Sequence, residues 1–240
     1  MGKLFYFEGP DGSGKTTISK KIFETIKEDT DYFLHLFSFP NKNAFGYDRL
    51  KKYINRTENK IPTDITQSLF IINMIESFET YINYALERNP DSFIFIDRSL
   101  ISTFVYNIKD GGVLEQRCLD FIYKSYDIKH NEVEFDIISK AITHSIVAPT
   151  NIFFIMPPLE ILIEHSKERI QNGEAELNDR IETVTKTYEL YKNIYNWYNK
   201  KATNPHEFVM LDEWDLNKSE DENYSKMSET ILNTILYNKI

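Results

Sequence analysis

The fold is indicated most clearly by the N-terminal segment Lys3-Leu-Phe-Tyr-Phe-Glu-Gly-Pro-Asp-Gly-Ser-Gly-Lys-Thr-Thr17. It begins with an apolar run, Leu4–Phe7, that predicts a buried strand, and it is followed by isoleucines spaced four residues apart, which predict a helix. Between them Gly9–Thr16 matches the pattern G-x-x-x-x-G-K-[ST]. A strand, a glycine-rich turn and a helix in this order are typical of a loop that binds the phosphates of a nucleoside triphosphate.

The residue types of this loop suit that chemistry. The glycines allow a tight turn whose N–H groups point inward, and the N-terminus of the following helix adds the positive end of its dipole. Lys15 is expected to reach the β- and γ-phosphates of ATP, and the Thr16 hydroxyl to ligate Mg²⁺. An ordinary glycine-rich turn into a capped helix is the alternative interpretation. The residues expected to contact ATP are Gly9, Asp11, Gly12, Ser13, Gly14, Lys15, Thr16 and Thr17.

Length, charge and cysteine content narrow the class of protein. A chain of 240 residues fits one large α/β domain, and a net charge of −9 argues against a general nucleic-acid or anionic membrane partner. Cys118 is the single cysteine, which excludes an intramolecular disulfide and a cysteine-based zinc site. No apolar run reaches the ~18 residues of a membrane span, and no basic leader precedes the first strand. We expect a cytoplasmic protein.

Apolar runs alternate with helical patterns along the chain. They predict strands at Leu4–Phe7, Tyr32–Phe39, Phe93–Asp97, Asn151–Met156 and Phe208–Leu211. Such alternation predicts an α/β fold with a five-stranded parallel sheet flanked by helices, in one domain over residues 1–240. Because the carboxyl ends of parallel strands meet at one edge, functional residues are expected directly after strands.

Two segments interrupt this pattern. Residues 110–148 are long for one connection and carry two helical patterns, which favours a helical insertion over an open loop. Residues 167–182 are polar, contain one glycine and lie between two helical patterns, as a mobile lid would; a solvated connection between helices is the alternative.

A second chemical site is predicted after the third strand. Asp97 falls at the carboxyl end of that strand, beside the expected phosphate loop, where its carboxylate can hold Mg²⁺. Arg98 follows directly and can bind an anion delivered to the same crevice. The alternative is a helix-capping aspartate with an incidental arginine.

Five motifs, in this order, resemble those of the thymidylate kinase family of P-loop nucleoside monophosphate kinases. They cover most of the chain, from the first strand to about Tyr191, and their order is more specific than any one of them. They are Phe7-Glu-Gly-Pro-Asp-Gly-Ser-Gly-Lys-Thr-Thr17, Phe39-Pro-Asn-Lys42, Ser68-Leu-Phe-Ile-Ile-Asn73, Asp97-Arg98 and Asn178-Asp-Arg-Ile-Glu182.

The resemblance implies a role for individual residues. It places Lys15, Thr16 and Asp97 at the ATP phosphates and Mg²⁺, and Arg169 and Arg180 in a catalytic lid. For the acceptor deoxynucleotide it implies Asp11 near the 3′-hydroxyl, Lys42 and Arg98 at the phosphate, Phe70 stacked on the base and Tyr106 against the deoxyribose, with Phe39, Asn73 and Ser102 completing the site. It also implies a P-loop kinase fold and a homodimer.

Three positions depart from the family pattern. Lys42 stands where the family usually has arginine, which keeps the charge and loses the bidentate geometry. Ser99 replaces an aromatic residue or histidine, so that Asp-Arg-Ser also resembles the Glu-Arg-Ser of deoxynucleoside kinases. Met74 stands where an arginine reads the pyrimidine edge, which leaves the accepted base open. Gly12 gives the loop no basic side chain of its own, so the lid is expected to supply an arginine, either Arg169 or Arg180.

The expected function is ATP-dependent phosphorylation of a pyrimidine deoxynucleoside monophosphate, with dTMP as the first choice. A deoxynucleoside kinase, or a kinase for a modified pyrimidine deoxynucleotide, is the nearest alternative. The former would need Asp97 or Glu8 as a base, because its acceptor is a neutral hydroxyl. A nucleotide-dependent switch or assembly ATPase is a third possibility, but it would leave the anion site at Lys42 and Arg98 unused.

Overall fold

The computed structural model of the chain describes residues 3–29, 32–54, 63–89, 91–107, 149–174, 180–201 and 208–237. The predicted insertion at 110–148 and residues 175–179 of the predicted lid lie outside these ranges. The elements are β1 Lys3–Glu8, α1 Lys15–Asp29, β2 Leu34–Ser38, α2 Tyr47–Ile54, α3 Thr63–Ser77, the π-helical turn η1 Phe78–Ile82, α4 Asn83–Arg88, β3 Phe93–Asp97, α5 Leu100–Asn107, β4 Asn151–Ile155, α8 Leu159–Gln171, α9 Ile181–Lys201, β5 Phe208–Leu211 and α10 Glu220–Tyr237.

The five strands form one parallel sheet in the order β2-β3-β1-β4-β5, which confirms the predicted α/β fold. The central strand β1 pairs with both β3 and β4. Its register sets Phe7 opposite Asp97. The phosphate loop, which leaves β1, therefore starts beside the carboxyl end of β3, where the Asp-Arg motif lies.

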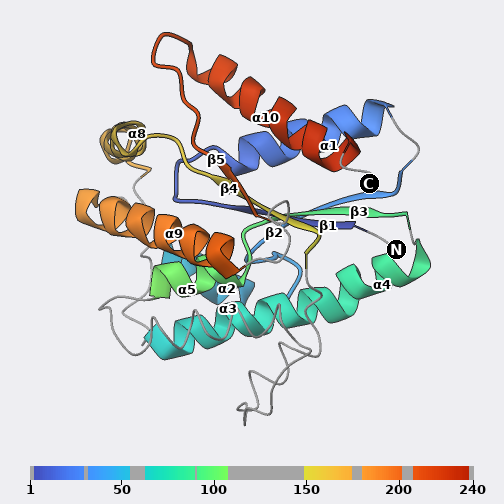
Figure 1. Cartoon of the computed structure of the whole chain (residues 1–240). Coiled ribbons are helices and arrows are strands. Elements are labelled where there is room, and N and C mark those ends of the chain that lie inside the picture. Colours follow the sequence, from blue (N-terminus) through green and yellow to red (C-terminus); the bar gives the residue numbers. More distant parts are fainter. Residues whose placement is uncertain are drawn as a thin grey trace.

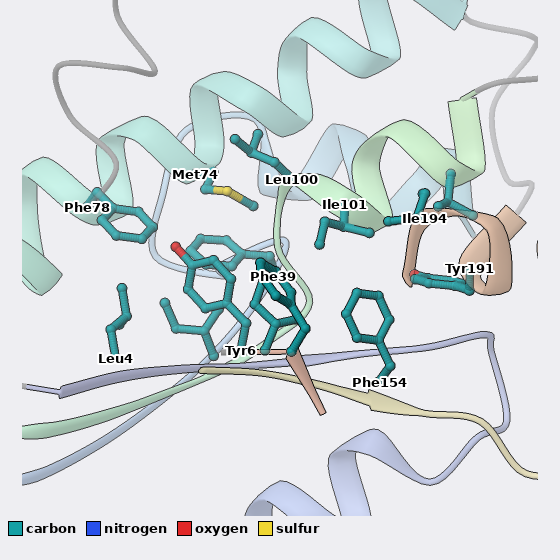
Figure 2. Close-up of a cluster of buried hydrophobic side chains, with 14 of the residues drawn as sticks. Leu4, Tyr6, Phe39, Met74, Phe78, Leu100, Ile101, Phe154, Tyr191 and Ile194 are labelled. Atoms are coloured by element: carbon teal, nitrogen blue, oxygen red, sulfur yellow. The ribbon is translucent and has the colours of Figure 1, made fainter. Parts of the chain in front are cut away.

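Helices cover both faces of the sheet (Figure 1), so that the three central strands β1, β3 and β4 are buried almost throughout. On one face α1 and α10 pack over phenylalanines of the central strands; the rings of Phe5 and Phe95 stack with centroids 5.4 Å apart. On the other face α3, α5 and α9 cover Leu4, Tyr6 and Phe154 (Figure 2). This double coverage explains why the strands read as continuous apolar runs rather than as an alternation.

The second strand is shorter than the sequence predicts. Tyr32 and Phe39 lie outside β2. Their rings pack against the core: Tyr32 stacks on Phe93 with ring centroids 4.4 Å apart, and Phe39 stacks on Phe78 with ring centroids 6.4 Å apart. Phe39 is thereby buried in the core, three residues before Lys42.

Within the described residues, no helix combines the length and apolar character that a membrane crossing requires.

Candidate active site

The phosphate loop runs from Gly9 into the first turn of α1 and is closed against two distant helices. Gly14 has φ of 84°, and a Cβ built there would lie 2.4 Å from the ring of Tyr224 on α10. Only glycine therefore allows α10 to approach this closely. Ser13 is buried, and its N–H donates to the carbonyl oxygen of Pro10 at 3.2 Å, which holds the turn.

Lys15 is buried within this loop. Its Nζ donates to the carbonyl oxygen of Pro10 at 2.5 Å and to Oγ of Ser13 at 3.4 Å. Burial, with a smaller contribution from Arg98, lowers the pKa of the Lys15 ammonium to about 8, although nearby carboxylates oppose the shift. The ammonium of Lys15 is therefore held away from water at a cost in free energy, and a bound anion would be needed to offset that cost in full.

Thr16 and Asp97 meet as the sequence predicts. The Thr16 hydroxyl donates to Oδ2 of Asp97. The other carboxylate oxygen, Oδ1, is buried and has no hydrogen-bond partner among the described residues. No group of three or more His, Cys, Asp or Glu side chains that could hold a metal occurs in the described ranges. A carboxylate with one unpartnered oxygen and an adjacent hydroxyl suit Mg²⁺, which takes few protein ligands beside phosphate oxygens and water.

Arg98 joins this cluster from the residue after β3. Its φ is 74°, an uncommon backbone conformation for a residue other than glycine. Its N–H donates to the carbonyl oxygen of Phe7 at 3.0 Å, its guanidinium pairs with Asp11, and it lies over the Tyr106 ring at 5.4 Å from the centroid. The arginine of the predicted acceptor site is thus tied directly to the phosphate loop.

Glu8 lies fully buried where β1 enters the phosphate loop, and its carboxylate accepts four hydrogen bonds. Oε1 accepts from the N–H of Ser99 at 2.6 Å and from the hydroxyl of the same residue at 2.5 Å. Oε2 accepts from the hydroxyls of Ser102 at 2.6 Å and Tyr191 at 3.2 Å. Burial, then the nearby charge of Glu8, raises the pKa of Tyr191 well above its usual value, so its hydroxyl keeps its proton. Ser102, assigned to the acceptor by resemblance, here braces Glu8.

The turn after β2 is held by Asn73 of α3. The Asn73 amide oxygen accepts from the N–H of Asn41 at 2.7 Å, and its nitrogen donates to the carbonyl oxygens of Asn41 and Phe45, both at 3.0 Å. Asn73 is therefore engaged in shaping the turn that carries the exposed Lys42. On the same helix Met74 is only 1% exposed and packs in the core (Figure 2).

The two candidate lid arginines differ in position. A Cβ built on Gly12 would lie 2.9 Å from Nη1 of Arg169, so this guanidinium occupies the space that the missing side chain leaves. Arg169 belongs to the last turn of α8, whereas Arg180 is exposed and directly precedes α9. Of the two, Arg169 is the one placed against the loop.

A cavity of about 450 Å³ opens over the loop, and Lys15, Thr16, Arg98 and Arg169 are among the residues that line it. Its lining includes six residues to which the sequence analysis assigns no individual role, His165, Glu168, Asn172, Glu174, Glu220 and Tyr224. A signal for His165 existed, because it precedes Arg169 by four residues and so shares its helix face. The full lining is Gly12, Gly14, Lys15, Thr16, Thr17, Arg98, His165, Glu168, Arg169, Asn172, Glu174, Glu220 and Tyr224.

The burial of Lys15 predicts a pH-dependent stability. Lys15→Met should stabilise the nucleotide-free protein at pH 7 by on the order of 2 kcal/mol and abolish phosphoryl transfer. Because the folded pKa of about 8 lies below the usual 10.5, wild-type stability should rise between these pH values, and the advantage of the variant should shrink. Denaturant titrations at pH 7 and pH 10 measure this. A variant less stable than wild type at both pH values would contradict the buried charge.

Comparison with known proteins agrees with this geometry. Residues 7–124 match the family model described as thymidylate kinase. The chain is 23% identical to the thymidylate kinase of Ureaplasma parvum over 96% of its length and 90% of the relative's. It is 26% identical to the thymidylate kinase of Plasmodium falciparum, with 84% and 83% covered, and 24% identical to a probable thymidylate kinase of Methanococcus maripaludis, with 98% and 96% covered. The chain is therefore similar to thymidylate kinases along most of its length, and these similarities indicate a nucleoside monophosphate kinase.

Proposed function

We propose that this kinase transfers the γ-phosphoryl group of ATP to the 5′-phosphate of a pyrimidine deoxynucleoside monophosphate, with dTMP as the first acceptor. The observation that carries the proposal is that one cavity is lined by Lys15 and Thr16 of the phosphate loop, by Arg98 after β3 and by Arg169 of α8. Phosphoryl transfer needs a donor and an acceptor held together among cations, and the cavity supplies cations from three separate elements.

Each cation has a proposed task. The loop N–H groups and Lys15 bind the donor phosphates, and Arg169 neutralises charge that develops on the transferred group. Arg98 and Lys42 hold the acceptor phosphate. An oxygen of that phosphate bonds to the γ-phosphorus while the bond to the β,γ-bridging oxygen breaks, so ADP leaves with the electron pair. The attacking oxygen is already anionic, and therefore the transfer needs no general base.

Thr16 and Asp97 are the residues proposed to hold Mg²⁺. The unpartnered Oδ1 of Asp97 and the adjacent Thr16 hydroxyl support this assignment. When bound, the ion would add positive charge beside the phosphates.

The base is the least constrained part of the acceptor. Phe70 is half-buried on α3 and remains the proposed stacking partner, with Tyr106 proposed at the sugar. Met74 lies in the core and brings no charge to the site. The names of the relatives favour dTMP, while the apolar residue at position 74 keeps a modified pyrimidine deoxynucleotide as the alternative.

A deoxynucleoside kinase would need a carboxylate to accept a proton from its acceptor hydroxyl. Glu8 is poorly suited to this role because its two oxygens already accept from Ser99, Ser102 and Tyr191. Asp97, with one unpartnered oxygen, is the remaining candidate base in the described site. The test must therefore decide whether the acceptor carries a phosphate, as a monophosphate kinase requires, or only a hydroxyl.

A steady-state assay of ADP formation with dTMP, dUMP, dCMP, dGMP, dAMP and thymidine tests the proposal. We expect dTMP to give the highest kcat/KM. Lys42→Ala should raise the KM for dTMP by about tenfold or more through the lost charge contact, and Lys42→Arg should restore it. Lys27→Ala, on the exposed last turn of α1, is the matched control.

Two outcomes would overturn the proposal. One is that none of the monophosphates stimulates ADP formation. The other is that thymidine alone is phosphorylated, with a KM that Lys42→Ala leaves unchanged, which would identify a nucleoside kinase.

We also propose that the chain acts as a homodimer, as the family resemblance implies. Phe45 and Ile72 are exposed apolar side chains beside α3 and suit such a contact. Light scattering should give twice the chain mass of 28.4 kDa, and a mass equal to one chain at assay concentrations would exclude the dimer.

A further inference from the structure

We propose that His165 is a positioning residue that bridges the phosphate loop to α10 and thereby fixes α8 so that Arg169 lies over Gly12. The inference rests on the proposed function, since it assigns the placement of the arginine that acts on the transferred group. The five sequence motifs do not include this histidine.

His165 contacts two elements besides its own. Its Nδ1 lies 2.9 Å from the carbonyl oxygen of Gly12, and its Nε2 lies 3.2 Å from Oε2 of Glu220 in the first turn of α10. The imidazole is only 17% exposed, whereas the Glu220 side chain is 49% exposed, so the arm to α10 is the one open to water. One side chain thus joins α8, the phosphate loop and α10.

Both partners of the imidazole are hydrogen-bond acceptors, so each ring nitrogen needs a proton in order to donate to its partner. The carbonyl oxygen of Gly12 can only accept, so Nδ1 holds a proton. A carboxylate of Glu220 also accepts, so a hydrogen bond from the ring to Glu220 requires a proton on Nε2. Of the two arms, the bond to Gly12 survives in the neutral ring that keeps its Nδ1 proton.

The bridge and the arginine act on the same point of the loop. His165 and Arg169 are four residues apart in α8 and share one helix face. A Cβ built on Gly12 would lie 2.9 Å from Nη1 of Arg169 and 3.4 Å from Cβ of His165. Because Gly12 has no side chain, it leaves room for both residues. Its carbonyl oxygen contacts His165, and the guanidinium of Arg169 lies against its Cα.

This geometry has a catalytic consequence. An arginine on an untethered helix end would lose conformational entropy each time it closed on the transferred group. With α8 anchored one turn earlier, that cost is met in the folded protein, and the guanidinium acts as a preorganised charge. The loss on removing the bridge should therefore fall on kcat more than on donor KM.

Three substitutions of His165 separate its two arms. The Asn amide nitrogen falls near the position of Nδ1 and can keep the bond to Gly12, whereas the Gln amide nitrogen reaches toward the position of Nε2 and Glu220. At saturating substrates we expect His165→Ala to lower kcat by about tenfold, with donor KM changed less than about threefold. His165→Asn should recover most of the rate, and His165→Gln less. Glu164→Ala, exposed on the same helix, is the matched control.

A double-mutant cycle decides whether His165 acts through Arg169. In an Arg169→Ala background, His165→Ala should cost less than about twofold more, because the residue that it positions is gone. The same cycle run on slow ATP hydrolysis without acceptor keeps the test independent of the acceptor assignment.

Three results would overturn the inference. An undiminished tenfold loss in the Arg169→Ala background would show that His165 acts by itself. An unchanged kcat together with a lowered Tm would show a structural role only. Equal rates for the Asn and Gln variants would show that the Gly12 arm has no special part.

Discussion

The site depends on one buried charge, the carboxylate of Glu8. A carboxylate removed from water is costly unless hydrogen bonds replace its hydration. Here Ser99, Ser102 and Tyr191 supply those bonds from the residue after the Asp-Arg motif, from α5 and from α9. Since Ser99 follows Arg98, whose φ is 74°, the two bonds to Glu8 hold this unusual backbone conformation in place. The carboxylate thus connects the end of β1 to the elements of the acceptor side.

Two further contacts join the phosphate loop and the start of α1 to the residues at the carboxyl end of β3. The guanidinium of Arg98 pairs with Asp11 of the phosphate loop, and the Thr16 hydroxyl donates to Asp97. Parallel pairing of the two strands brings these residues together, because it sets Phe7 opposite Asp97. Strand register and side-chain contacts thus bring Asp11, Thr16, Asp97 and Arg98 together at one edge of the sheet.

Local patterns were enough to predict the strands, the phosphate loop and the place of Asp97 beside that loop, because apolar runs and loop chemistry are set by neighbouring residues, whereas the order of the strands came from the structure. The environment of Glu8 was not predictable, since its partners lie 91 to 183 residues away. The choice between Arg169 and Arg180 also needed the structure: only helix register shows which faces Gly12. Asn73 was assigned to the acceptor by resemblance, but its amide groups are engaged with the backbone of the turn before α2.

The most direct test of this account is the affinity of Glu8→Gln for dTMP, measured by titration calorimetry on the folded variant. Glutamine keeps the shape of the side chain but offers a single acceptor oxygen, so the bonds that hold Ser99 and Ser102 cannot all form. The account predicts an affinity for dTMP at least about tenfold lower than that of wild type, with circular dichroism unchanged. A folded Glu8→Gln protein that binds dTMP as tightly as wild type would contradict it.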